Sequence, residues 1–265
     1  MTKIRFGTAG IGKISEIEET FENYNKLGIR ATEIEFVQGI YLHKQRHKNE
    51  IEKIKKLSEK LDIKLSIHAP FWVNLNSNDE EKIEASKKRI LDSCEVGEML
   101  GVERVVFHPA FYNGKEKEET YIKVREEILK IMEIINKKGW KVKLAPETTG
   151  KVNVFGSVEE ILRLVKDTGC EFTLDFSHVF ARNNGDITYE EIIKKFKGFK
   201  RLHCHFSGIE YSSKGEIRHK NTEESYWEEL LGALKNTGQE FVIINEAPEP
   251  EKDCVKGIKI WEEIN

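Results

Sequence analysis

Short apolar runs alternate with longer amphipathic stretches from one end of the chain to the other. In the two clearest amphipathic stretches, 80–100 and 118–138, Ile, Leu and Val recur at three- and four-residue spacing and Lys and Glu fill the other positions, which predicts helices. The short runs have the length and composition of β-strands. Eight strands are predicted, at 4–7, 31–36, 64–68, 104–108, 141–147, 171–175, 201–205 and 241–246.

These eight β-then-α units fill a chain of 265 residues, and α/β barrels occupy about 250. Successive strand ends lie roughly 28 to 41 residues apart, enough for a strand, a crossover helix and a return. No linker interrupts the alternation, so we predict one domain, 1–265, folded as a single (β/α)8 TIM barrel. A doubly wound sheet would alternate in the same way, but GTAGIG after the first strand lacks the G-x-G-x-x-G spacing common there.

Composition narrows the class of protein. No apolar run approaches the roughly 20 residues that span a bilayer, and the first residues carry no signal peptide, so we expect a cytoplasmic protein without membrane contact. The four cysteines show no C-x-x-C spacing and suit a reducing compartment. With 43 Lys+Arg against 46 Asp+Glu, the net charge of −3 excludes nucleic-acid binding through overall basicity and leaves only a local patch.

Imidazoles and carboxylates end six consecutive predicted strands. In a barrel these carboxyl ends share one rim, where barrel enzymes build their active sites. A single histidine is more often structural than functional, but six of the eight histidines gather here. The rim residues are His68, His108, Glu147, Asp175 with His178 after it, His203 and His205, and Glu246; the loop after the seventh strand adds Glu216 and His219.

This mixture of side chains predicts a metal site. Crowded carboxylates raise one another's pKa unless a cation neutralises them. Imidazole and carboxylate without organised thiolates suit Zn²⁺, and Mn²⁺ or Fe²⁺ are also suitable. Because there are too many ligands for one ion, we expect two or three, an arrangement typical of hydrolysis or transfer at phosphate.

From the third predicted strand onward, the chain resembles the endonuclease IV family of AP endonucleases. These are xylose isomerase-like barrels that incise DNA at abasic sites with a trinuclear zinc centre. The matching segments, in the family's order, are HAPFWVNL, FHPA, PETTG, DFSHVFA, LHCHFS, GEIRH and NEAP. Two departures are that the family usually has Asp where Glu216 stands, and Tyr where Phe71 stands.

The resemblance implies a role for each ligand. His68 and His108 would bind one ion, Glu147 would bridge it to a second ion bound also by Asp175, His203 and Glu246, and His178, Glu216 and His219 would bind a third. It implies a deoxyribonuclease IV-type hydrolase that cuts the phosphodiester 5′ to abasic sites in base excision repair, with Glu147 as the catalytic residue. The expected partner is double-stranded DNA containing abasic sites, bound by a monomer.

Basic and aromatic residues of the rim loops are candidate DNA contacts. Basic side chains neutralise phosphates, and aromatic side chains stack on or wedge into an opened duplex. The candidates retained are Phe71, Trp72, Arg182, Lys214 and Arg218.

Two other hypotheses of function stay open. In a sugar isomerase or epimerase of the same barrel class, Glu147, Asp175, His203 and Glu246 alone would bind one divalent ion. That reading leaves the other rim ligands without a metal role and predicts a sugar-sized apolar pocket. A metal- or DNA-binding protein that has lost turnover is the third hypothesis.

Overall fold

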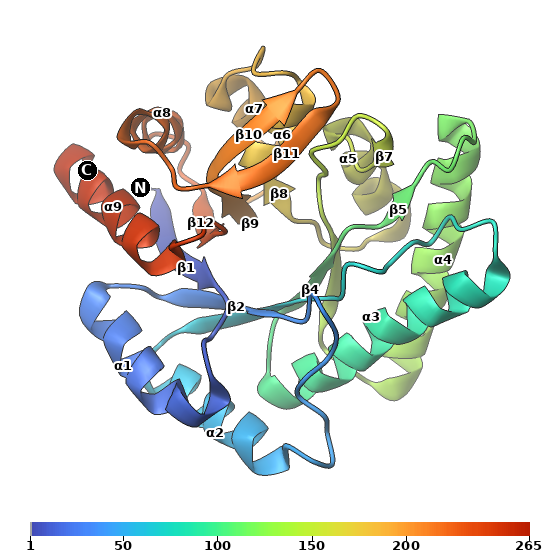
Figure 1. Ribbon diagram of the computed structural model, residues 1–265, viewed down its shortest axis with the longest axis horizontal. Helices are drawn as coiled ribbons and strands as arrows, with labels where there is room; N and C mark the ends of the chain where they lie inside the picture. The colour runs from blue at the N-terminus through green and yellow to red at the C-terminus, as the bar shows by residue number, and fades with distance from the viewer. Residues whose placement is uncertain (1) are drawn as a thin grey trace.

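The protein is built round a curled sheet of eight parallel strands, seen in a computed structural model that describes residues 2–265 (Figure 1). The strands follow one another in the order β6-β4-β3-β2-β1-β12-β9-β8. Their bounds are β1 Lys3–Ala9, β2 Ala31–Glu35, β3 Lys64–His68, β4 Arg104–Phe107, β6 Lys143–Pro146, β8 Leu174–Asp175, β9 Arg201–Phe206 and β12 Glu240–Asn245. This confirms the α/β class and the eight predicted sheet strands.

The two ends of this order, β6 and β8, meet through a short junction. Thr173 donates its N–H to the carbonyl of Pro146 and accepts from the N–H of Thr148, both at 3.1 Å. Glu147 and Thr173 form an isolated parallel bridge. Because this junction is a single bridge instead of a ladder, a fully closed (β/α)8 barrel stays a prediction.

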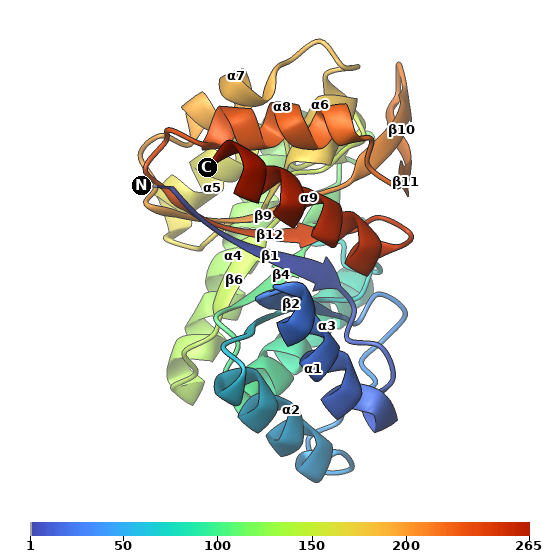
Figure 2. The same ribbon diagram turned by 90° about the vertical axis from the view of Figure 1, so that its left-hand side faces the viewer.

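Helices cover the outside of the sheet (Figures 1 and 2). Figure 2 shows the strand arrowheads pointing toward one side, where the hairpin of β10 (Gly208–Ser212) and β11 (Gly215–Lys220) stands. The predicted helices 80–100 and 118–138 correspond to α3 and α4. The helix bounds are η1 Ile14–Glu16, α1 Ile17–Leu27, α2 Lys48–Lys60, α3 Glu80–Leu100, α4 Lys117–Lys138, α5 Val158–Thr168, α6 Phe176–Arg182, α7 Tyr189–Lys195, α8 Glu224–Leu234 and α9 Pro250–Ile264.

Alternation along the strands separates an apolar outer face from a polar interior. On β9, Cys204 and Phe206 belong to the core between sheet and helices, and the Phe206 ring lies 4.7 Å from Trp227 of α8. His203 and His205 point to the other side, where both contact a carboxylate on β2. Barrel interiors are usually filled by Val, Ile and Leu. A polar interior therefore indicates that the inside of this sheet carries function.

The stretch 208–220 forms a β-hairpin where the sequence predicts a loop. Strand β10 (Gly208–Ser212) pairs antiparallel with β11 (Gly215–Lys220), and a smaller pair joins β5 (Ala110–Phe111) to β7 (Val154–Phe155). Glu216 donates its N–H to the carbonyl of Gly150 at 3.1 Å. At Gly215, φ is +91°, and a Cβ there would collide with that same carbonyl oxygen. Glycine thus lets the hairpin dock beside the carboxyl ends of the strands.

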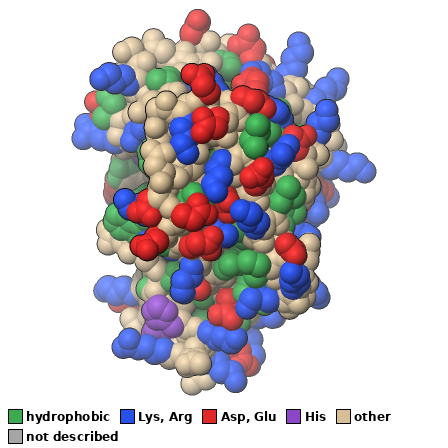
Figure 3. All heavy atoms as spheres, turned by 90° about the vertical axis from the view of Figure 1, so that its right-hand side faces the viewer, with side chains coloured by type: hydrophobic (Ala, Val, Ile, Leu, Met, Phe, Trp, Pro, Cys, Tyr) green, Lys and Arg blue, Asp and Glu red, His purple; other side chains and the backbone are tan. Residues whose placement is uncertain are grey.

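The outer surface mixes charges of both signs. Figure 3 shows Lys and Arg interspersed with Asp and Glu over one face of the molecule. Among residues 2–265 no helix has the length and apolar character needed to cross a bilayer. All four cysteines are buried and free, as expected of small apolar side chains.

Candidate metal centre

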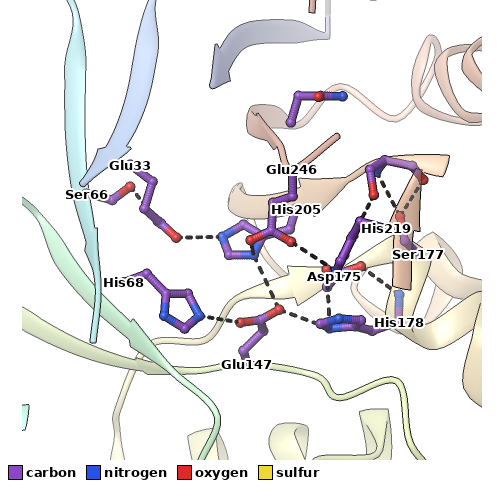
Figure 4. Close-up of polar contacts among 12 residues, drawn as sticks. Glu33, Ser66, His68, Glu147, Asp175, Ser177, His178, His205, His219 and Glu246 are labelled. Carbon is purple, nitrogen blue, oxygen red and sulfur yellow. Dashed lines mark hydrogen bonds and ion pairs between the residues drawn. The ribbon is translucent and has the colours of Figure 1, made fainter. Parts of the chain in front are cut away.

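Glu147 lies at the centre of a group of imidazoles at the carboxyl ends of the strands (Figure 4). Its Oε2 is 3.3 Å from Nε2 of His68 and 3.2 Å from Nε2 of His108. Its Oε1 is 3.1 Å from Nδ1 of His178 and 3.3 Å from Nδ1 of His205. One fully buried carboxylate therefore faces two pairs of histidines, one pair for each oxygen.

His68, His108 and Glu147 form the first of several groups whose ligand atoms lie within 4.8 Å of one another. His68 Nδ1 lies 2.8 Å from the carbonyl of Ala69, which can only accept a hydrogen bond. Nδ1 therefore keeps its proton, and the lone pair of Nε2 becomes available on the side of Glu147 when the ring is neutral. The sequence predicted these three residues as neighbours, and the structure brings them together.

Glu147, Asp175, His205 and Glu246 form a second group. The resemblance assigned His203 to this position, but the structure puts His205 there, with its Nδ1 3.3 Å from both Glu147 and Glu246. Both histidines point into the barrel because side chains two apart on a strand share a face. His203 lies one layer deeper, about 7 Å along the strand.

The third group contains Asp175, His178 and His219. Asp175 caps α6 by accepting the N–H of His178 through Oδ1 at 2.7 Å, which leaves Oδ2 only 3.2 Å from the His178 ring. Glu216 of the hairpin lies 3.4 Å from His178 Nε2. His219 Nδ1 is 2.6 Å from the hydroxyl of Ser207. Of the predicted triplet, His178 and His219 thus share this group with Asp175, and Glu216 lies next to His178.

Glu33 is a buried interior carboxylate that the sequence analysis missed. Its Oε2 accepts from Ser66 at 2.6 Å and from His203 Nε2 at 3.0 Å, and its Oε1 lies 2.9 Å from His205 Nε2. Burial raises the pKa of Glu33, but the charge of His205 and the bond from His203 hold it well below its ordinary value. Facing an ionised Glu33, His205 keeps its proton on Nε2, so the proton lost when the ring becomes neutral is that of Nδ1, which leaves the Nδ1 lone pair on the side of Glu147.

Glu35, two residues on, is a second carboxylate missed by the sequence analysis. One of its oxygens is buried without a hydrogen-bond partner among residues 2–265. Burial is the main cause that raises its pKa to about 7. The signal for both was present in ATEIEF, where glutamates alternate with apolar residues inside a predicted strand.

The carboxylates and imidazoles compensate one another's charges, and this shifts their pKa values. Burial raises the pKa of Glu147, but the charges of His108 and His205 outweigh burial and hold that pKa well below its ordinary value. Burial lowers the pKa of His68, but the hydrogen bond with Glu147 raises it to about 10. Burial raises the pKa of Glu246 to about 8, with Glu147 adding to it against the charge of His205. Without another cation, protonated imidazoles supply the positive charge.

Orphaned polar atoms test whether these residues fit a metal. In the described chain, the following buried atoms have no hydrogen-bond partner: Glu147 Oε1, Asp175 Oδ2, His178 Nε2 and both ring nitrogens of His205. Leaving a buried polar atom unsatisfied costs about 1–3 kcal/mol. A divalent cation would satisfy several of these atoms at once, and imidazole with carboxylate is a donor set that zinc prefers. The residues therefore fit a metal.

The predicted DNA contacts lie in different surroundings. Phe71 and Trp72 are 55% and 60% exposed, and the Phe71 ring lies 6.0 Å from that of His68. Arg182 donates to the carbonyls of Lys151 and Val154, so its guanidinium holds a loop in place. Lys214 occupies the exposed hairpin turn, and Arg218 pairs with Glu210 at 2.7 Å. Of these candidates, Phe71 contacts the metal centre most directly.

Comparison with known proteins finds a matching family model and relatives with similar sequences. Residues 21–264 match the model of the family described as xylose isomerase-like TIM barrel. The uncharacterized protein MJ0133 of Methanocaldococcus jannaschii is 36% identical over 272 residues, which cover 98% of this chain and 97% of that protein. A protein of Carboxydothermus hydrogenoformans named as a probable endonuclease 4 is 27% identical over 76% of each chain.

Solved structures share the fold over nearly the whole chain. SacUVDE has a TM-score of 0.77 at 19% identity and covers 100% of this chain and 99% of its own. Endonuclease IV from Thermus thermophilus has a TM-score of 0.70 at 22% identity, covering 99% and 100%. D-Psicose 3-epimerase from Clostridium cellulolyticum reaches 0.66 at 14% identity, covering 99% of each. At these identities the likeness concerns the fold alone.

The histidine pKa shifts predict that metal binding releases protons. Burial lowers the pKa of His178 and His205, but the carboxylates around them outweigh burial and raise both well above the ordinary value. With His68 they are protonated at pH 7 in the metal-free protein, and a metal ligand must lose its proton. Titrating Zn²⁺ calorimetrically in buffers of different ionisation enthalpy should show proton release and an affinity that rises with pH. Binding without proton release would contradict these shifts.

The contact between Glu33 and His205 predicts a positioning role for Glu33. Glu33→Gln removes the charge that holds the His205 proton on Nε2, so we expect metal affinity to fall by about tenfold to a hundredfold. Competition with a fluorescent chelator measures this fall directly. Glu126→Gln, an exposed change of the same kind on α4, is the control. Equal affinity in the two variants would show that Glu33 is not needed to orient the ring.

Proposed function

The chain belongs to the xylose isomerase-like TIM barrel family, and we propose that it is a metal-dependent endonuclease of DNA repair. Its substrate is double-stranded DNA, cut at the phosphodiester 5′ to an abasic site in base excision repair. The ligands are the three groups around Glu147, with His205 taking the place that the resemblance gave to His203. They hold two to three zinc ions, or Mn²⁺ or Fe²⁺, in a monomeric, cytoplasmic enzyme.

The observation that carries this proposal is the distribution of donors around Glu147. Its Oε2 faces one pair of imidazoles and its Oε1 faces another, so each oxygen belongs to a separate set of donors. Zinc takes about four ligands, and these sets hold more donors than one ion uses. Clustered ions stabilise the attacking and leaving oxygens of a phosphoryl substitution. The donor count therefore favours phosphodiester hydrolysis.

Buried side chains bind the metal ions, and exposed side chains contact DNA. When bound, the divalent ions supply an activated water nucleophile at neutral pH and neutralise charge on the phosphate oxygens. Glu147 fixes the spacing of the two imidazole pairs. Glu33 orients His205 from below, and Ala69 orients His68 through its carbonyl. The exposed rings of Phe71 and Trp72 can stack on bases when an abasic nucleotide is turned out of the duplex.

The names of the relatives support a nuclease. Endonuclease IV proteins occur among the sequence relatives and the solved structures. Epimerases occur among the solved structures at 13% to 21% identity, so a sugar epimerase or isomerase is the second candidate. That activity would need the four donors of the second group alone. It gives no role to His108, Glu216 or His219, which is why we favour the nuclease.

Glu147→Gln separates catalysis from DNA binding. The substitution removes the charge shared by both imidazole pairs while nearly keeping the shape, so cleavage should fall on the order of a hundredfold or more, about 3 kcal/mol. Binding to the duplex should change far less, because the phosphate contacts lie on the rim. The assay follows a labelled duplex with one abasic-site analogue on a gel, and a filter-binding series in rising salt follows affinity.

The controls are Glu228→Gln, an exposed change on α8, and the same duplex without the lesion. Glu228→Gln should cut like the unmodified protein, and the intact duplex should remain uncut. Full cleavage by Glu147→Gln would reject its central role. If the unmodified, metal-loaded protein leaves the abasic duplex intact but interconverts ketoses, the epimerase reading replaces this one.

A further inference from the structure

A cavity of about 820 Å³ opens at the end of the barrel opposite the metal centre. Its mouth is lined by the first residues of four sheet strands, Lys3 of β1, Lys64 of β3, Arg201 of β9 and Glu240 of β12. These are the amino ends of the strands, whereas the metal donors lie at the carboxyl ends. The volume falls within the roughly 300–1,000 Å³ typical of small-molecule pockets.

A nearly buried arginine lines this cavity. Arg104 begins β4, and its side chain is only 10% exposed. Its one ion pair within residues 2–265 is with Glu103 at 3.4 Å, and Glu103 also pairs with Arg201 at 3.6 Å. Among residues 2–265, the contact with Glu103 is the one ionic partner of the Arg104 guanidinium. A guanidinium has five N–H donors, so pairing with one carboxylate leaves several of them available to a ligand in the cavity.

The charge of the lining is positive, although the whole chain carries −3. Six basic and four acidic side chains line the cavity. Three of the acidic groups are already paired: Glu103 with Arg104 and Arg201, Glu240 with Lys3 at 3.5 Å, and Asp62 with Arg5 at 2.9 Å. Lys64 and Lys141 have no ion pair in the described chain. Such a surplus in a partly enclosed space attracts anions.

The inner end of the cavity reaches the polar interior of the barrel. His203 and Ser66 line it, and both also donate to Glu33. Leu65, Leu202 and Phe241 provide apolar wall beside them. The site therefore combines an anchoring cation, polar groups and apolar surface, which together suit a small organic anion better than a bare ion.

We propose that this cavity binds a small molecule through a phosphate group, with Arg104 as its main anchor. Guanidinium matches the geometry of phosphate by donating two parallel hydrogen bonds, which a single lysine cannot do. Lys64, Lys141 and Arg201 add positive charge at the mouth. The site is distinct from the metal centre and does not depend on the nuclease reaction.

The test is calorimetric titration of the metal-loaded protein with inorganic phosphate and, separately, with ribose 5-phosphate. Because phosphate also binds metal ions, Glu147→Gln is titrated in parallel, and binding in the cavity should persist in that variant. Arg104→Gln should weaken cavity binding on the order of tenfold or more. Lys137→Gln, an exposed change on α4 that removes the same charge, should bind like the unmodified protein. Tighter binding of ribose 5-phosphate than of phosphate assigns the site to an organic phosphate, and equal binding assigns it to the free ion.

Arg201→Gln is a second variant for the case that Arg104→Gln does not fold. The Arg201 side chain is 68% exposed, so we expect its replacement to leave folding unchanged. It should weaken binding in the same direction as Arg104→Gln, by less. A folded Arg104→Gln protein with unchanged affinity overturns the proposal. So does a Glu147→Gln protein that no longer binds either ligand, since all binding would then belong to the metal centre. If Arg104→Gln fails to fold, unchanged affinity in Arg201→Gln overturns it instead.

Discussion

The carboxylate of Glu147 faces imidazoles on both of its oxygens, inside a protein interior where unbalanced charge is costly. Burying a carboxylate is tolerated only when paired groups or a metal compensate for it. Here four histidines from different strands and loops converge within 3.1–3.3 Å of it. The hairpin that brings Glu216 and the cap that fixes His178 both serve this cluster. The arrangement of the carboxyl ends of the strands follows from the need to balance that charge.

Opposite charges also face one another deeper in the barrel interior, toward the amino ends of the strands. Glu33 lies between His205 above and His203 below, so imidazole and carboxylate alternate through the middle of the sheet. The apolar core lies outside, between strands and helices, where Trp227 and Phe206 pack. The side chains that stabilise the fold and those that form the metal centre therefore lie on opposite faces of the same strands. A polar interior also explains how a cavity lined by Arg104 can exist at the amino ends, where barrels are usually filled with apolar side chains.

Strand positions and rim residues could be predicted because both depend on local pattern. Alternating apolar runs gave α3 and α4 within a residue and placed His68, His108 and Glu147 at strand ends. The choice between His203 and His205 could not be made, since both point inward and only their depth along β9 separates them. Glu33 and Glu35 were missed because glutamate inside a strand looks like a solvent-facing position until the interior is known to be polar. The hairpin position of Glu216 depends on long-range docking against Gly150, which no local pattern contains.

Counting and locating the metal ions tests the central role of Glu147 most directly. Protein purified without chelator should contain two to three divalent ions per chain by elemental analysis. Anomalous diffraction at the zinc edge should place ions on both sides of the Glu147 carboxylate, one toward His68 and His108 and another toward His205. One ion per chain, bound to the second group alone, or ions that leave Glu147 uncoordinated, would contradict the account.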